Sequence, residues 1–449
     1  MIENLESRFT SVSVKAVVIA ALTVLMLWPL SRVESLVSER QTLQAQAYAV
    51  IAAGFGGSQV IGAPILTVDT ENRTVEVDPY TKNKTETWTK GAPLHLLPDE
   101  VQITNDVSVE VRSKGIYSVP VYVSKVVMTG VFKPDAIASL LRSTADVQVF
   151  STRAAFQLPL PGVKYLRALT RFEVDGQPLR ATSGGVAGLT ALGTPIDLKS
   201  RGDANPVAFR LEFEIAGSES LHFLPLGSHT TVTANVAWPH PDFDGAFLPT
   251  SRDIKPEGYS AKWEVLELNR AYPQTWRGAS VTEAALLATA FGVQLFQPSN
   301  IYTQNYRAVR YGILFVAITF ACFFAWEHLV RGLRLHPMQY LLVGLALATF
   351  YLLLLALSEH IGFALSYAVA AAALVALITA YIAGASNNRV AAFGIGAALA
   401  STYGILYVIL LSQDYALLFG SLLLFVILAA LMIATRRLDW SKIGREDAK

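Results

Sequence analysis

The chain has 449 residues, of which 52% are hydrophobic and 16% are charged, and its formal net charge is +1. This composition is too apolar for an ordinary water-soluble protein and too polar for a helix bundle throughout, so it predicts separate membrane and non-membrane parts. The near-neutral charge argues against a nucleic-acid partner, because duplex binding needs a concentrated positive field and none occurs in the sequence. The single cysteine, Cys322, excludes an intramolecular disulfide.

The first predicted element is a transmembrane helix at the apolar run 16–30. A cleaved signal peptide is the alternative, but the first Ala-x-Ala pattern, at Ala45 and Ala47, comes too late for it. Apolar residues then recur at helical spacing up to the glycines at 54–57, so we expect the helix to continue outward. Its apolar face suits packing on its own domain or, alternatively, a coiled coil with a partner. The face comprises Val33, Leu36, Val37, Leu43, Ala47, Val50 and Ile51.

Residues 60–305 have the pattern of a β-rich domain. Short alternating or β-branched runs, such as VSVEV at 107–111 and FRLEFEI at 209–215, are separated by Gly, Pro, Asn and Asp. One short helix is predicted at 134–142, where Pro134 suits the first turn. The glycine-rich segment 183–193 is predicted to be a loop or a crossing between subdomains.

Five further apolar runs follow this domain, at residues 311–330, 338–357, 361–385, 390–411 and 415–434. Each is long enough to cross a hydrocarbon core about 30 Å thick. The predicted fold is therefore an integral membrane α-helical bundle of six transmembrane helices, with a large β-rich (α+β) periplasmic domain inserted between the first and second. The predicted parts are a cytoplasmic amino terminus and first helix at 1–31, the β-rich domain with its amino-terminal amphipathic helix at 32–306, a five-helix bundle at 307–435 and a cytoplasmic tail at 436–449.

The distribution of basic residues predicts the orientation. With the amino terminus inside, the cytoplasmic segments carry most of the nearby Lys and Arg, and the short opposite loops around Glu359 and Asp414 carry none. The basic residues are Arg8, Lys15, Arg331, Arg334, Arg389, Arg436, Arg437, Lys442 and Arg445. Both termini are then cytoplasmic, and in a bacterium the β-rich domain lies in the periplasm.

Candidate binding residues in the β-rich domain are His240, Asp242 and Asp244, within the segment WPHPDFDGAFLP at 238–249. The alternative reading is a rigid turn, which needs the same residue types. The histidines lack the spacing of a zinc site, and neither a phosphate loop nor a nucleophile elbow occurs in a fitting context. We therefore predict no metal, no cofactor and no enzymatic activity.

Candidate residues in the bundle are Glu327 and His328 near one end of the second span, Gln339 in the third, and Glu359 and His360 near its other end. Charges at membrane depth are usually functional, so a proton relay or ion pathway is one hypothesis. The other is that these residues lie at the membrane boundary, where a carboxylate is readily solvated.

Four segments give the chain a resemblance to the CreD family of bacterial inner-membrane proteins. They are RLHPMQYLLVGLALATFYLLLLALSEHIGF at 334–363, WPHPDFDGAFLP at 238–249, GIYSVPVY at 115–122 and RAVRYGILFVAITF at 307–320. The resemblance covers nearly the whole chain. It implies an inner-membrane protein linked to cell-envelope integrity, typically under a Cre-type two-component stress response, with altered colicin or β-lactam tolerance on perturbation. It supplies no catalytic or ligand residues.

The sequence therefore favours a non-catalytic envelope-integrity protein in the inner membrane. Its periplasmic domain is expected to bind an envelope protein or a peptidoglycan-related component, while the bundle anchors it in the lipid bilayer. The alternative is a transporter or lipid-handling protein with its pathway in the carboxyl-terminal bundle. Mid-span ionisable residues and inverted repeats, which transport would favour, are not evident in the sequence, and the sequence does not determine the oligomeric state.

Overall fold

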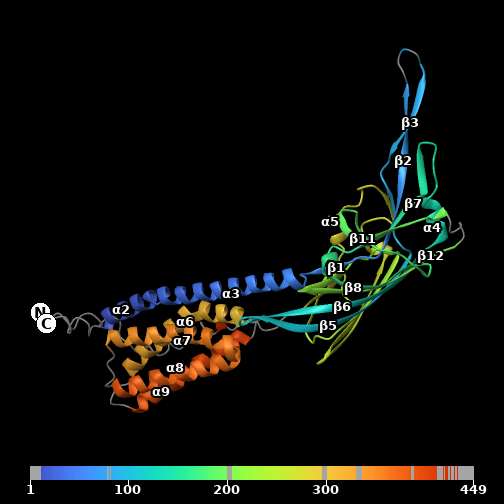
Figure 1. Cartoon of the computed structure of the whole chain (residues 1–449). Coiled ribbons are helices and arrows are strands. Elements are labelled where there is room, and N and C mark those ends of the chain that lie inside the picture. The colour runs from blue at the N-terminus through green and yellow to red at the C-terminus, as the bar shows by residue number, and fades with distance from the viewer. Residues whose placement is uncertain are drawn as a thin grey trace, which may run out of the picture. The chain divides into compact units, whose positions relative to one another are not determined.

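The computed structural model describes residues 12–77, 80, 82–199, 205–295, 301–329, 336–385 and 389–411, together with residues 418, 420–422, 425, 429 and 432 (Figure 1). The chain divides into two compact units. A helical unit contains residues 1–45 and 299–449, and a β-rich unit contains residues 46–298.

Five segments of the helical unit are long and apolar enough to cross a membrane, which confirms five of the six predicted spans. These segments are Val14–Phe55, Ile301–Phe324, Pro337–Ile361, Phe363–Gly384 and Ala392–Leu411. The helices that form them are α2 (Val12–Leu25), α3 (Leu27–Phe55), α6 (Ile301–Leu329), α7 (Pro337–Ile361), α8 (Phe363–Ala385) and α9 (Arg389–Leu411). The sixth predicted span, 415–434, lies mostly outside the described residues, and the tail 436–449 lies wholly outside them.

The first helix continues well beyond its apolar run and ends at Phe55, which confirms the predicted stop at the glycines. It is interrupted only at Met26, because Pro29 has no N–H to donate to the carbonyl of residue 25. Val33, Val37 and Ala47 of the predicted apolar face are buried, whereas Leu43 and Val50 are exposed. The chain itself therefore covers only part of this face.

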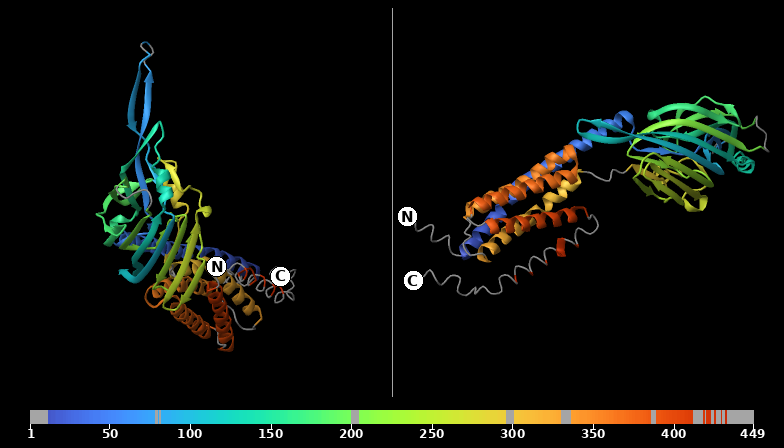
Figure 2. Two further views of the ribbon diagram at one scale, coloured as in Figure 1. Left: turned by 90° about the vertical axis from the view of Figure 1, so that its right-hand side faces the viewer. Right: turned by 90° about the horizontal axis from the view of Figure 1, so that it is seen from below.

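The helices of this unit lie side by side (Figure 2). Helix α6 contacts α2, α7, α8 and α9, and α7 contacts α2, α6 and α8. Gly344 allows one close approach between helices. A Cβ atom at this position would lie 2.8 Å from Sδ of Met26 and 2.9 Å from Cζ of Phe320. Three helices thus meet at a residue without a side chain, which is typical of helix packing in membranes.

The described residues of the β-rich unit form three sheets. The largest has eight strands in the order β16-β17-β14-β5-β6-β12-β8-β9. Strand β14 runs parallel to β5, and the other pairs in this sheet are antiparallel. The strands are β16 (Ser251–Lys255), β17 (Gly258–Leu266), β14 (His229–Val236), β5 (Glu100–Lys114), β6 (Tyr117–Phe132), β12 (Val207–Ser218), β8 (Leu166–Val174) and β9 (Gln177–Pro178).

Two smaller sheets complete the unit. The seven-stranded sheet has the order β10-β11-β7-β2-β4-β18, with β3 paired to β2, and the four-stranded sheet has the order β1-β13-β19-β15. The strands of the first are β10 (Thr182–Val186), β11 (Leu189–Ile196), β7 (Val147–Pro159), β2 (Ile65–Val77), β4 (Leu94–Leu96), β18 (Thr275–Arg277) and β3 (Lys84–Lys90). Those of the second are β1 (Gln59–Ile61), β13 (Ser220–Phe223), β19 (Phe291–Leu295) and β15 (Pro241–Gly245). Among the described residues of this unit that follow β1, the helices are α4 (Pro134–Leu140), which confirms the predicted short helix, α5 (Glu283–Leu287) and two single 3-10 turns, η1 (Val163–Tyr165) and η3 (Glu267–Asn269).

Aromatic side chains join the three sheets into one hydrophobic core. Phe156 of the seven-stranded sheet contacts Phe209 and Phe172 of the eight-stranded sheet, with ring centroids 5.5 and 5.7 Å apart. At the other end of the eight-stranded sheet, Trp263 contacts Phe291 of the four-stranded sheet at 5.9 Å. The smaller sheets therefore cover different parts of the same inner face of the large one.

One prediction for this unit is wrong. The glycine-rich segment 183–193 is not a loop or a subdomain crossing, because strands β10 and β11 pair there as an antiparallel hairpin. Ala187 and Gly188 form its two-residue turn with φ angles of +51° and +87°. A turn with two positive φ angles matches the twist of paired strands. These strands could not be predicted from patterns of β-branched residues, because they are rich in glycine.

Candidate functional site

The first cluster of candidate residues forms around Glu327, near the end of α6. Lys15 of α2 donates a hydrogen bond to the Glu327 carboxylate, and the Tyr340 hydroxyl of α7 lies 3.3 Å from its other oxygen. The Lys15 and Glu327 side chains are only 13% and 8% exposed. The Lys15 ammonium also lies 5.9 Å from the centroid of the Tyr340 ring. These contacts link α2, α6 and α7 at one end of the unit.

The second cluster forms around Glu359, near the end of α7. Its carboxylate accepts a hydrogen bond from the Tyr302 hydroxyl at 3.1 Å and lies 3.7 Å from Nε of Arg40. Beside it, the fully buried Asn305 donates a hydrogen bond to the Ser358 hydroxyl at 2.8 Å. The amide oxygen of Asn305 has no partner among the described residues. The second cluster therefore joins α3, α6 and α7 at their other ends.

The separation of the two clusters matches a bilayer. Along α7, the distance from residue 340 to residue 359 is roughly 28 Å at 1.5 Å per residue, and from 302 to 327 along α6 it is roughly 38 Å. A bilayer has a hydrocarbon core of about 30 Å and a full thickness of about 40–45 Å with its headgroups. Both clusters therefore fit the headgroup regions, where charged groups are solvated more readily.

The remaining candidates in the bundle have local roles. Gln339 accepts a hydrogen bond from the backbone N–H of His336 at 2.8 Å, and Nδ1 of His336 accepts one from Met338 at 3.2 Å, which caps the start of α7. His360 is exposed, and its Nδ1 lies 3.1 Å from the carbonyl of Ala356 in its own helix. The side chain of His328 lies outside the described part of the structure.

The structure places the candidate residues His240, Asp242 and Asp244 in and just before one edge strand, β15. Residues 241–245 form strand β15, and the exposed His240 precedes it with its ring against that of Trp238. Among the described residues, no hydrogen bond or ion pair joins His240 to either aspartate. Asp244 instead lies 2.8 Å from Nε2 of His222 and accepts a hydrogen bond from Gln294 at 2.7 Å.

The partnership of His222 and Asp244 depends on a glycine. Both residues are register partners of Gly292 on the strand between them. Because Gly292 has no side chain, the two side chains can meet across the intervening strand. The sequence contains no signal that connects His222 to Asp244, because the contact depends on the strand order.

A polar row crosses the outer face of the eight-stranded sheet and was not predicted. One register line joins Glu214, Lys125, Asp106, Asn235, Ser260 and Asp253 on six adjacent strands. Nζ of Lys125 lies 3.4 Å from the Glu214 carboxylate. The Asn235 amide donates to Asp106 at 2.9 Å, and the Ser260 hydroxyl donates to Asn235 at 2.9 Å. The alternation of polar residues along each strand is visible in the sequence, but their alignment across neighbouring strands can be known only from the strand register.

Part of this row lines a cleft of about 510 Å³, which we call the sheet cleft. Its walls include Asp106, Lys125, Asp253, Lys255 and Glu257. The Asp253 carboxylate lies 2.8 Å from the Lys255 ammonium and raises the pKa of that group. The sheet cleft thus presents carboxylates, ammonium groups and amides together, which suits a polar ligand that carries hydrogen-bonding groups and charge.

Among the residues that the structure describes, no group of three or more His, Cys, Asp or Glu side chains is placed to hold a metal ion. The site residues that sequence reasoning missed are mainly partners of predicted ones, namely Lys15, Arg40, Tyr302 and His222, together with the buried Asn305, which pairs with Ser358. Each is distant in sequence from its partner.

Comparison with known proteins gives two matches. The model of the family described as "Inner membrane protein CreD" matches residues 11–441 of this chain. A protein of Escherichia coli (strain K12) with the same description is 30% identical over 421 residues, which cover 93% of this chain and 91% of that protein.

Proposed function

The chain belongs to the CreD family of inner membrane proteins, and from this premise we propose that it supports cell-envelope integrity by presenting its β-rich unit in the periplasm. In this proposal the β-rich unit binds an envelope protein or a peptidoglycan-related component at the sheet cleft. The helices serve as an anchor, and the role is non-catalytic.

The observation that carries this proposal is the position of the charges in the helical unit. Glu327 and Glu359 lie near helix ends, where each is paired with a basic residue. Helix α8 contains no Asp, Glu, Lys or Arg, and the one such residue of α9 is its first, Arg389. A transport pathway usually places ionisable groups near the midplane, and neither α8 nor α9 has an Asp, Glu, Lys or Arg there, which favours an anchor.

The proposed orientation has six spans, with residues 415–434 as the last and both termini in the cytoplasm. It is supported by the Glu327 cluster, which gathers the start of α2, the end of α6 and the start of α7 at one end of the unit. The sequence adds Arg331 and Arg334 between α6 and α7, and Arg436 and Arg437 after the last span. This grouping of basic residues follows the positive-inside rule.

The binding role is tested by cross-linking in cells from the sheet cleft. A photoreactive amino acid at Ser108, which lines the cleft, is expected to capture an envelope component. The same probe at Leu268, which is 92% exposed and outside the cleft, is the matched control. The double variant Asp106→Ala/Lys125→Ala should weaken resistance of the cells to detergent, while Arg171→Ala/Glu173→Ala on the same sheet should not. Equal capture at both sites, or unchanged resistance in the cleft variant at normal protein levels, would contradict the proposal.

A transporter or lipid-handling protein is the second candidate, and the buried, unpartnered amide oxygen of Asn305 beside the Glu359 cluster favours it. Under the anchor proposal, Glu359→Gln should retain envelope integrity, because glutamine can still accept the hydrogen bond from Tyr302. The measurement is detergent resistance at matched protein levels. Loss of function with normal folding would instead support a pathway through this cluster.

A further inference from the structure

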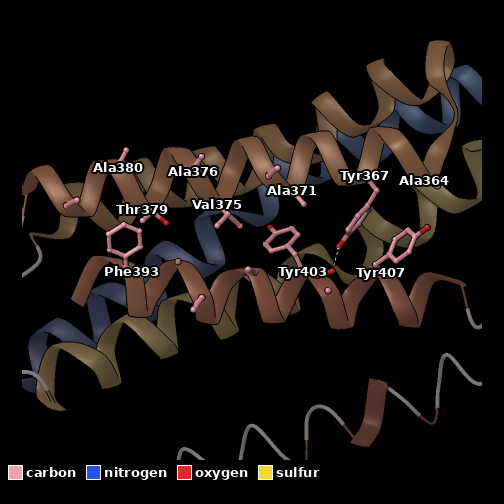
Figure 3. Close-up of a pocket in the computed structure, with 17 residues that line it drawn as sticks. Ala364, Tyr367, Ala371, Val375, Ala376, Thr379, Ala380, Phe393, Tyr403 and Tyr407 are labelled. Atoms are coloured by element: carbon pink, nitrogen blue, oxygen red, sulfur yellow. Dashed lines mark hydrogen bonds between the residues drawn. The ribbon is translucent and has the colours of Figure 1, made fainter. Parts of the chain in front are cut away.

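A groove of about 1010 Å³ lies between α8 and α9, and alanine forms most of its lining (Figure 3). The Tyr367 hydroxyl donates a hydrogen bond to the carbonyl of Tyr403 at 2.6 Å across it. Lipid tails are as apolar as such a lining, so the groove specifies no protein partner. An exposed strand of the β-rich unit is more informative, because its charges restrict what can pair with it.

Strands β2 and β3 form a hairpin that extends away from the other strands of the β-rich unit (Figure 1). Residues 73–77 of β2 pair with residues 84–88 of β3, whereas β7 pairs with β2 only up to residue 72. Among the described residues, this part of β2 therefore has β3 as its only neighbouring strand. An isolated two-stranded hairpin is marginally stable in water, and a third strand or a packed face normally supports it.

The outer edge of β3 is open. All seven residues of the strand are exposed, and β2 is its only strand partner in the part of the chain that the structure describes. The backbone N–H and C=O groups on the other side of β3 can therefore pair with a further strand. Which strand fits this edge depends on the side chains that alternate along it.

The side chains of β3 alternate between the two faces of the hairpin. If a second copy of β3 adds in antiparallel orientation, a two-fold axis perpendicular to the sheet relates the two strands. Directly opposite residues then come from the same face, so the axis passes through a residue. One face carries Lys84, Glu86, Trp88 and Lys90, and the other carries Thr85, Thr87 and Thr89.

Charge disfavours two of the three registers that have a long overlap. With the axis at residue 86, 87 or 88, the two copies of the strand overlap over residues 84–88, 84–90 or 86–90. The axis at Thr87 places Lys84 opposite Lys90 at both ends, and the axis at Glu86 places two glutamates opposite each other. Like charges that lie directly opposite destabilise a strand pair.

The axis at Trp88 instead gives a favourable partner at every position. Trp88 then lies opposite its own copy, because the axis passes through it. Glu86 lies opposite Lys90 twice, and Thr87 lies opposite Thr89 twice. Aromatic pairs, opposite charges and threonine pairs are the cross-strand contacts that stabilise a sheet.

The ion pairs within one hairpin leave a basic group for the second copy. Arg73 of β2 donates a hydrogen bond to the Glu86 carboxylate. By contrast, Lys90 has no ion pair among the described residues. In the register centred on Trp88, each Lys90 ammonium gains the Glu86 carboxylate of the other copy.

We propose that two copies of the chain associate through β3, in the antiparallel register centred on Trp88. The two hairpins then form one four-stranded sheet in the order β2-β3-β3-β2. A second copy fits this edge better than an unrelated strand, because the pattern Glu86-x-Trp88-x-Lys90 is complementary to itself when it is reversed. The inference rests neither on the sheet cleft nor on the orientation proposed above.

Cysteine cross-linking tests the register in the full-length protein in membranes, with Cys322→Ser as the background. Directly opposite residues have Cα atoms about 4.5–5.5 Å apart, which suits a disulfide. Oxidation of Trp88→Cys should therefore produce a covalent dimer in most of the protein. The control Thr85→Cys is exposed on the same strand. Its two copies would lie roughly 20 Å apart along the strands, at about 3.3 Å per residue, so it should remain monomeric.

Charge exchange tests whether the partner is a second copy. In the Trp88→Cys chain, either Glu86→Lys or Lys90→Glu creates two like-charge pairs in a dimer of one variant, so the disulfide yield should fall by about tenfold. When the two variants are produced together with tags of different mass, every introduced charge faces an opposite charge. The mixed dimer should then form with the yield of the parent Trp88→Cys chain.

Three outcomes would overturn the proposal. Equal dimer formation at residues 85 and 88 would reject the register. A yield that responds to neither charge variant would show that these charges do not select the partner. Failure of the mixed dimer to form, with both variants at normal levels in the membrane, would assign the strand to a different protein.

Discussion

Replacing Lys15 with methionine is expected to lower the unfolding free energy of the helical unit by about 3–5 kcal/mol, the usual effect of breaking a buried ion pair. The Glu327 side chain is 8% exposed and receives its hydrogen bonds from Lys15 and Tyr340. Without Lys15, a largely buried carboxylate loses the ammonium group that is paired with it. Unfolding of the purified protein in detergent, compared between wild type and variant, measures the loss.

The control for this prediction removes both charges. The double variant Lys15→Met/Glu327→Gln leaves no unpaired ion, so it should recover most of the lost stability. Arg32→Met, an exposed site in the same continuous stretch of helix, should change stability by less than about 0.5 kcal/mol. If Lys15→Met proved as stable as Arg32→Met, Glu327 would not depend on its partner, and the cluster would not hold the three helices together.

Sequence patterns predicted the helices and strands of this protein better than the contacts between them. Apolar runs of about 20 residues locate α7, α8 and α9 well, because spanning hydrocarbon requires such a run whatever the neighbouring helices are. The alternating strands and the short helix α4 were visible for a similar local reason. Helix α6 starts earlier than the predicted residue 311. Its first turns carry polar residues of the Glu359 cluster, so they do not belong to the apolar run on which the prediction was based.

The candidate sites show where local patterns stop being informative. The sequence shows Glu327 and Glu359 as ionisable residues near span ends, but their basic partners lie about 300 residues earlier in the chain. Asp244 was grouped with His240 because they are near in sequence, whereas the sheet pairs it with His222. The polar row of the large sheet likewise needs the strand order, which neither hydropathy nor residue spacing provides.

His95 makes the β-rich unit sensitive to acid. It lies in β4, is 5% exposed and stacks on Trp276 with ring centroids 5.0 Å apart. The Thr67 hydroxyl donates its only proton to Gln157 at 2.8 Å, so at 3.0 Å it accepts from Nδ1–H of His95. Burial of the ring disfavours the charged imidazolium and lowers the pKa of His95 to about 4.

The sign of the effect follows from this lowered pKa. The unfolded chain binds a proton at His95 below about pH 6.5, whereas the folded chain resists protonation until about pH 4. The stability is therefore complete above pH 6.5 and falls as the pH drops toward 4. At pH 4.5 the expected loss from this one group is about 2.5 kcal/mol relative to neutral pH. Denaturant unfolding followed by tryptophan fluorescence at pH 7.5 and 4.5 measures it.

Two variants isolate His95 from the other groups that titrate in this range. In His95→Gln the amide can still donate to Thr67 but does not titrate, so its stability should fall less between pH 7.5 and 4.5 than that of the wild type. His229→Gln removes an exposed histidine of the same unit and should retain the wild-type pH dependence. Because His95 links β4 to β2 through Thr67, and Trp276 belongs to the edge strand β18, protonation should first loosen this edge of the seven-stranded sheet. An equal loss of stability in wild type and His95→Gln would show that the acid sensitivity arises elsewhere in the β-rich unit.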